Sequence, residues 1–333
     1  YSKKSYNNKY GVPLSLFKIN KKDSFGVFEV GMDKKGEIDY LSRIIKPNIG
    51  IITNISYAHS KNFKNLFGIA KAKSEIIDNI LKNGSIVLNA DDEFYNYFKL
   101  RALNRNLKII SFSIKNKSNI KLETIKNLKN ISIIKVNIYG CSRKFIIKKN
   151  LEFYIENILA SLAVISNYLD LNNVSEKFFF NYNLPDGRGD YKYIKIDNKK
   201  IHLIDESYNS NPLSLKFALK NFSKLRTQSK RKIILLGDML ELGKFSKKLH
   251  IEAAKIVNNT NINRVYVFGK KIIYTFNKIR PQKRGKILYS RKDISIFLKN
   301  DIKNGEYLMI KGSNSTGLNN ISKKLKLGKI NVI

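Results

Sequence analysis

Short apolar runs alternate with amphipathic stretches along this chain, which predicts an α/β fold. Residues 49–52 form a β-branched run after Pro47, the pattern of a buried strand. From Leu66 to Ile80 the apolar residues recur at roughly helical spacing, so this stretch is expected to pack on the sheet as a helix. The same reasoning predicts strands at 26–28, 85–88 and 106–113 and a helix at 36–46. Residues 89–92, NADD, are expected to cap the helix that follows them. Hairpins are expected over 118–149, with Gly140 at a turn.

The second half of the chain predicts a more regular series of strands and helices. An amphipathic helix is expected at 151–169, and Pro185 with two nearby glycines indicates a connector. We therefore expect a first domain over residues 1–185 and a second over 186–333. In the second domain, a hairpin with Asp197 and Asn198 at its turn precedes strands at 232–236, 265–268, 286–289 and 307–310. Their alternation with helices predicts a mainly parallel, Rossmann-like sheet.

Polar side chains gather where the predicted strands end. Thr53 and Asn54 follow the strand at 49–52, and His59 lies just beyond them. Glu29 ends the run at 26–28, and Lys73 lies on the helix predicted after Leu66. In an open α/β sheet, the ends of neighbouring strands converge on the ligand crevice. A carboxylate, an imidazole and a lysine are therefore expected near one site.

The densest polar stretch is DESYNSNP, residues 205–212, between a strand and a helix that Pro212 begins. A turn that served only the fold would seldom need so many polar groups, and loops at strand ends commonly carry sites. GDMLELG follows the strand at 232–236, and Lys311 and Ser313 follow the last strand. His202, by contrast, alternates with apolar neighbours inside a strand and is expected to be structural.

Charge changes this picture less than its size suggests. The 333 residues carry 63 Lys and Arg against 26 Asp and Glu, a formal net charge of +37, which alone would suggest a nucleic-acid partner. The basic residues are spread through every segment, however, and no RNA- or DNA-binding motif accompanies them. Lys, Asn, Ile, Tyr and Phe, all encodable by A and T alone, are abundant and Trp is absent. A nucleotide-composition bias explains the charge better, and no nucleic-acid partner is expected.

The remaining composition indicates a cytoplasmic protein. Cys141 is the single cysteine, which excludes an intramolecular disulfide and suits a reducing compartment. No apolar run approaches the ~18 residues that a bilayer span needs, and the N-terminus has no signal-peptide pattern. A hydrophobic content of 43% is enough for two or three domains, each with a core.

Several stretches, in a fixed order, carry a family resemblance. EVGM at 29–32, GEIDYL at 36–41, KPNIGIITNISYAH at 46–59 and GIAKAKSEI at 68–76 follow NN-x-x-GVP at 7–13. With DESYNSNP and GDMLELG, they resemble the Mur ligases. DESYNSNP differs from the family's D-D-S-Y-N-A-N-P at Glu206 and Ser210, and both changes preserve polar character. The resemblance implies a P-loop-type central ATPase domain followed by a Rossmann-like C-terminal ligase domain.

The resemblance also implies an activity and its site. The activity is an ATP-dependent amide ligase that adds D-alanyl-D-alanine to a UDP-N-acetylmuramoyl tripeptide through an acyl phosphate, in peptidoglycan synthesis. ATP and Mg²⁺ are the implied cofactors, and a monomer is expected. By resemblance, catalysis is assigned to Lys73, His59 and Arg188; ATP binding to Asn157, Arg188, Asp205, Asn209 and Asn211; substrate binding to Asn7, Asn8, Thr53, Asn54, Lys311 and Ser313; and Mg²⁺ to Glu29, His59 and Lys73 as a carbamate. Lys71 is the competing candidate for the carbamate, but the motif alignment favours Lys73.

The sequence departs from the family in one respect. The phosphate-binding loop G-x-x-x-x-G-K-[ST] does not occur in the 333 residues, and the first residue is Tyr. We therefore expect the chain to lack the N-terminal part of the central domain and, as this fragment, to fold without ligating. Such a loop supplies backbone N–H donors and a lysine to the phosphates. The alternatives are a sister Mur ligase or folylpolyglutamate synthase, a basic nucleic-acid-binding protein, and a decayed copy that folds without activity.

Overall fold

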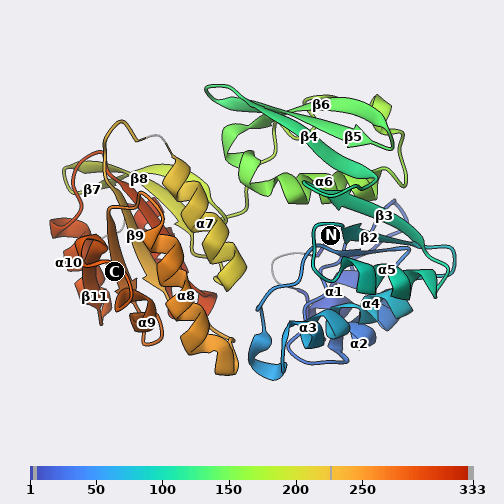
Figure 1. Ribbon diagram of the computed structural model, residues 1–333, viewed down its shortest axis with the longest axis horizontal. Coiled ribbons are helices and arrows are strands. Elements are labelled where there is room, and N and C mark those ends of the chain that lie inside the picture. The colour runs from blue at the N-terminus through green and yellow to red at the C-terminus, as the bar shows by residue number, and fades with distance from the viewer. Residues whose placement is uncertain (3–5, 226, 329–333) are drawn as a thin grey trace. The chain divides into compact units, whose positions relative to one another are not determined.

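The chain forms two compact units, shown in Figure 1. The structure, a computed structural model, describes residues 1–2, 6–225 and 227–328. One unit comprises Tyr1–Ile55 and Asn62–Tyr182, and the other comprises Ser56–Lys61 and Asn183–Ile333. The short segment 56–61 therefore packs with the second unit, although only residues 53–55 separate it from a strand of the first. Nothing in its hydrophobic pattern indicated this.

The first unit is built on a six-stranded sheet in the order β1-β2-β3-β4-β5-β6. Strands β1 to β4 pair in parallel, whereas β4, β5 and β6 pair antiparallel. The predicted hairpins are confirmed, and Gly140 has a positive φ of 96° in the turn between β5 and β6. The strands are β1 (Ile49–Ile52), β2 (Ser85–Asn89), β3 (Lys108–Ser113), β4 (Ile120–Asn127), β5 (Ile131–Ile138) and β6 (Cys141–Lys148).

Helices bury their apolar faces against this sheet. Residues of α3, α4 and α5 join β1 and β2 in one apolar cluster, and α6 packs over β2, β3 and β4. The helices are α1 (Gly11–Leu16), α2 (Glu37–Ile45), α3 (Leu66–Lys73), α4 (Glu75–Asp78), α5 (Tyr95–Leu103) and α6 (Ile155–Ile165). Helix α6 is shorter than the predicted 151–169, because Lys149–Tyr154 form a 3₁₀ turn before it.

The helix predicted from Leu66 to Ile80 is broken at Ser74. The Ser74 hydroxyl donates to the Lys71 carbonyl at 2.7 Å, and such return of a hydroxyl to the preceding turn commonly bends a helix. Ser74 ends α3 and precedes α4. The break directs Glu75 toward the start of α2, where its carboxylate accepts from the backbone N–H groups of Gly36 at 2.9 Å and Asp39 at 3.1 Å. Glu75 therefore caps a helix whose own N-cap is a glycine.

The strand predicted at 26–28 is not formed. This segment has no assigned secondary structure, and the Ser2 N–H donates to the Val27 carbonyl at 2.9 Å. A strand needs a ladder of such bonds along a neighbouring strand. Within the described residues the apolar run lies against the N-terminal segment instead, so Glu29 follows an irregular stretch.

The prediction that NADD caps the following helix was also wrong. Helix α5 begins at Tyr95, and its N-cap residue, Phe94, makes no side-chain capping bond. The Asp91 carboxylate instead accepts from the backbone of the loop after β3, with 2.6 Å to the Ile114 nitrogen and 2.9 Å to the Asn116 nitrogen. Capping and loop bracing both satisfy free N–H groups with a carboxylate, so the sequence alone did not separate them.

The second unit has the predicted mainly parallel sheet, in the order β11-β10-β9-β12-β8-β7. Every neighbouring pair is parallel except β7 with β8, which form the predicted hairpin. The strands are β7 (Asp190–Ile196), β8 (Lys199–Glu206), β9 (Lys232–Gly237), β10 (Arg264–Phe268), β11 (Arg284–Leu288) and β12 (Tyr307–Lys311), and the helices are α7 (Pro212–Lys224), α8 (Ser246–Asn258), α9 (Ile273–Phe276), α10 (Arg291–Asn300) and α11 (Leu318–Lys326).

Helices cover both faces of this sheet. Alternate strand residues such as Ile234 and Leu236 pack with α7 and α8, whereas Ile233 and Leu235 pack with α10 and α11. This explains the continuous apolar run of β9, because both faces of a parallel sheet are buried. None of the helices within the described ranges combines the length and apolarity of a membrane span.

Candidate functional site

Loops from three parallel strands of the second unit meet at the carboxyl end of the sheet. The chain leaves β8 for β9, continues to β10 and β11 on one side, and returns as β12 between β9 and β8. The strand order therefore reverses between β9 and β12, where open α/β sheets form their ligand crevice. Gly237 and Gly312 face each other there, and a Cβ on Gly312 would lie 3.1 Å from the Gly237 Cα. Two glycines thus let the loops after β9 and β12 approach closely.

The DESYNSNP loop begins at this end of β8. Asp205 is buried, and one of its carboxylate oxygens accepts from the Ser207 N–H at 3.0 Å and from the Ser207 hydroxyl at 2.5 Å. The other oxygen pairs with the Lys326 ammonium at 2.5 Å, and Lys326 also contacts Asp190. Burial opposes this charge, but the two carboxylates outweigh burial and raise the pKa of Lys326. Asp205 therefore holds the loop in shape, and its lysine partner could not be predicted from the sequence.

Two asparagines of the loop have different structural tasks. Asn209 accepts from the Ser210 N–H at 2.8 Å through its side chain. Asn211 is the N-cap of α7, accepts from the Ser214 N–H at 2.9 Å, and forms a capping box with Ser214. Pro212 occupies the first helical position as predicted. An N-cap asparagine keeps its NH₂ group for other partners, so a ligand role for Asn211 stays a prediction.

Lys311 lies under this loop and is 1% exposed. Its ammonium donates to the Asn209 carbonyl at 3.0 Å and lies 3.4 Å from a Glu206 carboxylate oxygen. Burial lowers the pKa of Lys311, against the attraction of Glu206. Burial likewise raises the pKa of Glu206, against the attraction of Lys311. The pair therefore places two ionisable groups with shifted pKa values at the carboxyl end of the sheet.

Ser313 connects the three loops. Its hydroxyl accepts from the Leu240 N–H at 2.9 Å and donates to the Ser210 carbonyl at 3.1 Å. Its backbone N–H donates to the Asp238 carbonyl at 3.0 Å. The GDMLELG loop, DESYNSNP and the segment after β12 are therefore fixed to one another through a single buried serine.

A buried histidine supports the GDMLELG loop from below. His250, on α8, is fully buried, and its Nε2 accepts from the Met239 N–H at 3.1 Å. Its Nδ1 lies 2.7 Å from the Ser246 carbonyl oxygen. Since Nε2 accepts, Nδ1 must carry the proton and donate to that carbonyl, which requires a neutral ring. Sequence reasoning placed His250 on a helix but did not predict this contact.

Protonation of His250 should therefore destabilise the protein. Burial lowers the pKa of His250 below its ordinary value of 6.5, although the Ser246 carbonyl opposes this. Between the folded and unfolded pKa values the unfolded chain binds more protons, so stability falls as pH drops below about 6.5. We expect the thermal unfolding midpoint of His250→Gln to fall less over this pH range than that of the parent. The comparison isolates His250, because His202 and His59 are present in both proteins. Parallel curves would contradict the assignment.

Arg188 lies on the connector at the start of the second unit. Its guanidinium stacks over the Tyr208 ring, with 4.3 Å to the ring centroid, and Gly187 accepts from the Tyr208 N–H at 3.1 Å. Gly187 has a φ of 75°, and a Cβ there would lie 2.9 Å from the Tyr208 nitrogen. The predicted connector glycine is thus required both by its dihedral angle and by close packing. This places Arg188 beside DESYNSNP.

His59 belongs to the segment that packs on the second unit. Its Nδ1 lies 2.6 Å from a Glu241 carboxylate oxygen, and the Lys61 N–H donates to the Glu241 carbonyl at 2.8 Å. Both His59 and Glu241 have positive φ values, 56° and 62°. The structure gives His59 a carboxylate partner, and its role as a Mg²⁺ ligand stays a prediction.

In the first unit, Lys73 is the half-buried lysine of the AKAKSEI motif. Its ammonium donates to the Asn54 carbonyl at 3.2 Å. Burial lowers the pKa of Lys73, with a partial opposing effect from Asp92. Lys71, in contrast, is exposed and lies 6.0 Å from the Phe67 ring centroid. The two competing lysines therefore have different environments, and Lys73 lies beside the residues that follow β1.

Asp92 and Asn89 hold this strand end in place. The Ile55 N–H donates to the Asp92 carboxylate at 2.7 Å, and the Asn89 amide donates to the Thr53 carbonyl at 3.1 Å. Thr53 and Asn54 thus offer backbone carbonyls to the protein itself. Sequence reasoning assigned Asp92 to a helix cap and did not predict its contact with the Ile55 N–H.

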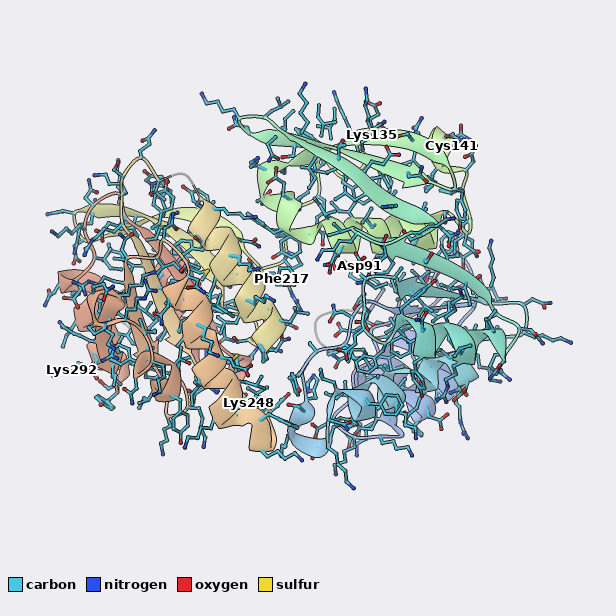
Figure 2. The ribbon with its side chains drawn as sticks, in the orientation of Figure 1. Asp91, Lys135, Cys141, Phe217, Lys248 and Lys292 are labelled. Atoms are coloured by element: carbon cyan, nitrogen blue, oxygen red, sulfur yellow. The ribbon has the colours of Figure 1, made fainter. Side chains whose placement is uncertain are left out.

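Three further predicted residues lie elsewhere in the first unit. Asn157 is exposed in the first turn of α6, and the neighbouring Glu156 has a pKa raised by burial and by Asp91 and Asp92. Asn7 donates to Glu29 at 3.0 Å. Asn8 accepts from the Gly11 N–H at 3.0 Å and so supports the start of α1. Asp91, which follows β2, is labelled in Figure 2.

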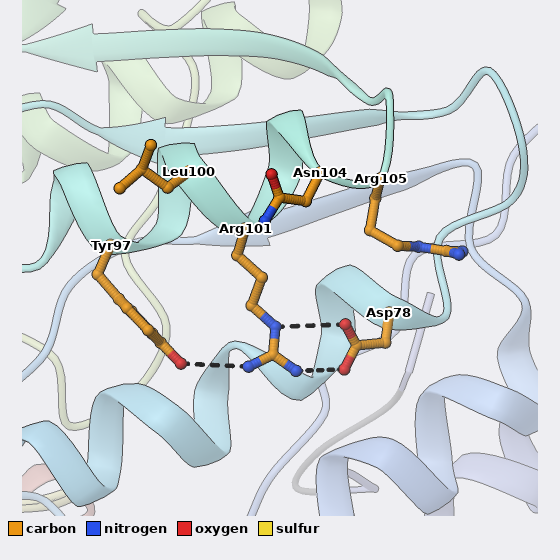
Figure 3. Close-up of a pocket in the computed structure, with 6 residues that line it drawn as sticks. All are labelled: Asp78, Tyr97, Leu100, Arg101, Asn104 and Arg105. Carbon is orange, nitrogen blue, oxygen red and sulfur yellow. Dashed lines mark hydrogen bonds and ion pairs between the residues drawn. The ribbon is translucent and has the colours of Figure 1, made fainter.

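A surface hollow between α4 and α5 contains none of the predicted site residues. Figure 3 shows that Asp78 faces the Arg101 guanidinium, which also donates to the Tyr97 hydroxyl at 3.1 Å. The carboxylate holds the guanidinium through two hydrogen bonds. The positive charge is therefore already balanced within the protein.

No group of three or more His, Cys, Asp or Glu side chains could hold a metal ion within the described ranges. Mg²⁺ does not require such a group, because it commonly takes one or two carboxylates together with waters and phosphate oxygens. Glu29 is an exposed carboxylate with one oxygen engaged by Asn7. Its chemistry fits Mg²⁺, whereas His59 is a poorer donor for so hard a cation.

Comparison with known families matches each unit to a domain of the Mur ligases. The Mur ligase middle domain matches residues 1–165, and the domain described as Mur ligase, glutamate ligase domain matches residues 192–314.

Curated relatives match along nearly the whole chain. The UDP-N-acetylmuramoyl-tripeptide–D-alanyl-D-alanine ligase of Buchnera aphidicola subsp. Baizongia pistaciae is 32% identical over 329 residues, covering 96% of this chain and 67% of that protein. The ligase of the same name from Rickettsia prowazekii is 30% identical over 329 residues, covering 96% and 70%.

Solved structures share the fold. A crystal structure of MurF from Acinetobacter baumannii matches with a TM-score of 0.85 at 24% identity, covering 98% of this chain and 70% of that one. MurF ligase from Thermotoga maritima in complex with ADP matches with a TM-score of 0.83 at 21% identity, covering 100% and 74%.

Proposed function

This chain belongs to the Mur ligase family, and from that premise we propose that it is the ATP-dependent ligase that adds D-alanyl-D-alanine to the UDP-N-acetylmuramoyl tripeptide in peptidoglycan precursor synthesis. One observation carries the proposal: relatives of that activity match 96% of the chain. The geometry agrees with it, because Asn209, Lys311 and Ser313 meet at the carboxyl ends of β8 and β12.

The reaction forms one amide bond at the expense of one ATP. The terminal carboxylate of the tripeptide takes the γ-phosphoryl group, and ADP leaves. The dipeptide amine then attacks the acyl carbon, loses a proton and displaces phosphate. Bound Mg²⁺ would neutralise phosphate charge in such a transfer. Glu29 is the protein carboxylate best suited to hold it, and the family resemblance adds Lys73, as a carbamate, and His59 as ligands.

Polar residues of each unit would bind and orient the reactants. Arg188, stacked on Tyr208, presents a planar fork that can hold phosphate oxygens bidentately. Asp205, Asn209 and Asn211 shape the loop between β8 and α7, and Asn157 at the start of α6 would lie beside the adenine. Lys311 and Ser313 fix that loop against its neighbours, so the site is preorganised by the fold. Asn7, Asn8, Thr53 and Asn54 would contact the tripeptide substrate.

The proposal also assigns a compartment and a state. ATP and the UDP-linked precursor occur in the cytoplasm, so the ligase would work there. A monomer suffices, because each predicted site residue comes from this one chain.

The test is substrate-dependent phosphate release by the protein as the cell produces it. Release should require ATP, the muramoyl tripeptide and D-alanyl-D-alanine together. Release with L-alanine or 2,6-diaminopimelate as the amine, on their matching precursors, would favour a sister ligase, and release with folate and glutamate would favour folylpolyglutamate synthase. Nucleotide binding that depends on a divalent ion and changes little with salt would exclude a general nucleic-acid-binding role for the site.

A further inference from the structure

The exposed part of the β7–β8 hairpin carries an unusual set of side chains. Strand β7 lies at the edge of the second unit's sheet. Its residues Ile194 and Ile196 point toward α10 and α11 and are buried. The alternating residues Tyr191 and Tyr193 therefore point to the opposite face, where they are 51% and 55% exposed.

Four aromatic rings join on this face into one surface. His202 on β8 is stacked on Tyr307 of β12, with ring centroids 3.9 Å apart and an interplanar angle of 0°. Tyr193 meets His202 edge-on, with centroids 4.3 Å apart. The Tyr191 hydroxyl contacts the His202 Nδ1. We call Tyr191, Tyr193, His202 and Tyr307 the aromatic platform.

Two lysines lie beside the platform, in an arrangement that destabilises the hairpin. Lys195 of β7 and Lys200 of β8 are directly opposite each other in the antiparallel register. By strand alternation both lie on the platform's face. Like charges at directly opposed positions are destabilising. Among the described residues, neither Lys195 nor Lys200 forms an ion pair that would offset this.

The first unit contains a comparable pair of opposed lysines, and there a carboxylate offsets the positive charge. Lys135 of β5 and Lys144 of β6 are also directly opposed in an antiparallel register, and Figure 2 labels Lys135. There, the Glu123 carboxylate of β4 lies 3.3 Å from the Lys135 ammonium. The protein thus supplies its own anion at one lysine pair and leaves the other to solvent. The second pair is suited to an anion from outside.

We propose that the aromatic platform and its two lysines bind single-stranded RNA. Exposed rings on a sheet face stack unpaired bases, and adjacent lysines neutralise the phosphates between them. A single nucleotide would gain only one stack from so open a surface, whereas a strand gains several together. A duplex keeps its base faces covered and would meet only the lysines. Since cellular DNA is mostly duplex, RNA is the single strand that such a surface would encounter.

The platform is separate from the ligase site. Tyr307 is the first residue of β12, whereas Lys311 is its last. Tyr193, His202, Tyr307 and the two lysines thus lie toward the amino ends of β8 and β12, and only Tyr191, opposite Ile204, lies near the ligase loop. The inference therefore goes beyond the proposed ligase. The sequence showed no such cluster because Tyr193, His202 and Tyr307 come together only when β7, β8 and β12 pair.

The experiment is fluorescence anisotropy with a labelled oligouridine of about ten nucleotides. Tyr193→Ala should weaken binding about tenfold, as expected for one lost stack. Lys195→Gln/Lys200→Gln should weaken it and reduce the slope of log K against log salt by about 1.4, or 0.7 for each phosphate contact. The matched control, Lys135→Gln/Lys144→Gln, changes net charge equally and should leave the slope unchanged. Circular dichroism melts check that each variant folds.

Competitors distinguish the ligand classes. Heparin, which has charge but no bases, and a duplex of equal length should compete more weakly than unlabelled oligouridine. Oligothymidine that binds more tightly than oligouridine would replace RNA by DNA as the ligand. Equal losses in the two lysine variants, unaltered binding by Tyr193→Ala, or equal competition by heparin would each overturn the proposal in favour of bulk charge. Absence of oligonucleotide binding, with the platform variants instead losing a protein partner, would overturn it in favour of a protein interface.

Discussion

In the full-length enzyme, with the phosphate-binding loop restored, the Lys73→Ala variant should lose ligation by on the order of 10²-fold or more, because it loses a group that holds Mg²⁺ at the reacting phosphates. Carbamate formation requires a neutral amine, and burial lowers the pKa of Lys73. The reacting nitrogen adds to CO₂ and releases a proton, which turns a cationic side chain into an anionic one. The Asn54 carbonyl, 3.2 Å from the Lys73 nitrogen, would orient that nitrogen.

Short carboxylates such as formate should restore part of the lost activity, because they can replace the carbamate in the space left by the side chain. Lys71→Ala is the matched control, since Lys71 lies two residues away on the same helix and is exposed. A ¹³C signal from labelled CO₂ should appear in the parent and be absent from Lys73→Ala. Full activity of Lys73→Ala without added carboxylate would sink the carbamate assignment.

Lys311→Met should be the most destabilising substitution at the carboxyl end of the second sheet. Lys311 is 1% exposed and donates to the Asn209 carbonyl. Removing one partner of a buried pair leaves the other without compensation, at a cost of about 3–5 kcal/mol. Here the group left behind is Glu206, together with an unsatisfied carbonyl of the DESYNSNP loop. Chemical denaturation of the second unit measures the loss.

The pH dependence of this loss identifies its cause. Burial raises the pKa of Glu206, and without Lys311 only the weaker attraction of Arg188 opposes that rise. A folded pKa above the unfolded value means that the folded state binds more protons, so stability declines as pH rises through the folded value. The deficit of Lys311→Met should therefore shrink at acidic pH, and Lys311→Met/Glu206→Gln should recover part of it at neutral pH. A deficit that is independent of pH and unrelieved by the second substitution would point to lost packing instead.

The strands and the parallel order of the second sheet could be predicted because burial on both faces leaves a local signature. Apolar runs such as 232–236 and 307–310 are bounded by polar residues, and each became a strand. The β7–β8 hairpin was equally predictable, because Asp197 and Asn198 are residues that tight hairpin turns prefer. In the structure, Asp197 has the positive φ, 51°, that such a turn requires.

The predictions that failed concern residues whose partners lie far away in the sequence. The run at 26–28 is as apolar as a strand but pairs with the N-terminal segment rather than with the sheet. Asp91 looks like a helix cap, and its actual partners lie in the loop that follows β3. The contact of His59 with Glu241 joins residues whose sequence neighbourhoods give no hint of each other. Local pattern reports propensity and burial, whereas these outcomes are set by tertiary contacts.

The site residues divide in the same way. DESYNSNP could be recognised as a strand-end loop because its polarity exceeds what a turn needs. Lys326, which neutralises Asp205, lies on the last described helix and resembles any exposed lysine in the sequence. His250 also gave no signal, because a histidine on an amphipathic helix has no feature that indicates which loop it will support.

The capping of α2 by Glu75 also constrains the order in which the first unit folds. A helix of nine residues is too short to persist alone in water, and the carboxylate that completes its first turn lies 39 residues beyond Gly36 in the chain. Helix α2 can therefore gain its full stability only after the stretch that bends at Ser74 has docked. The nucleus of this unit should accordingly contain α3 and α4 with β1, while α2 joins it late and is among the first elements to open.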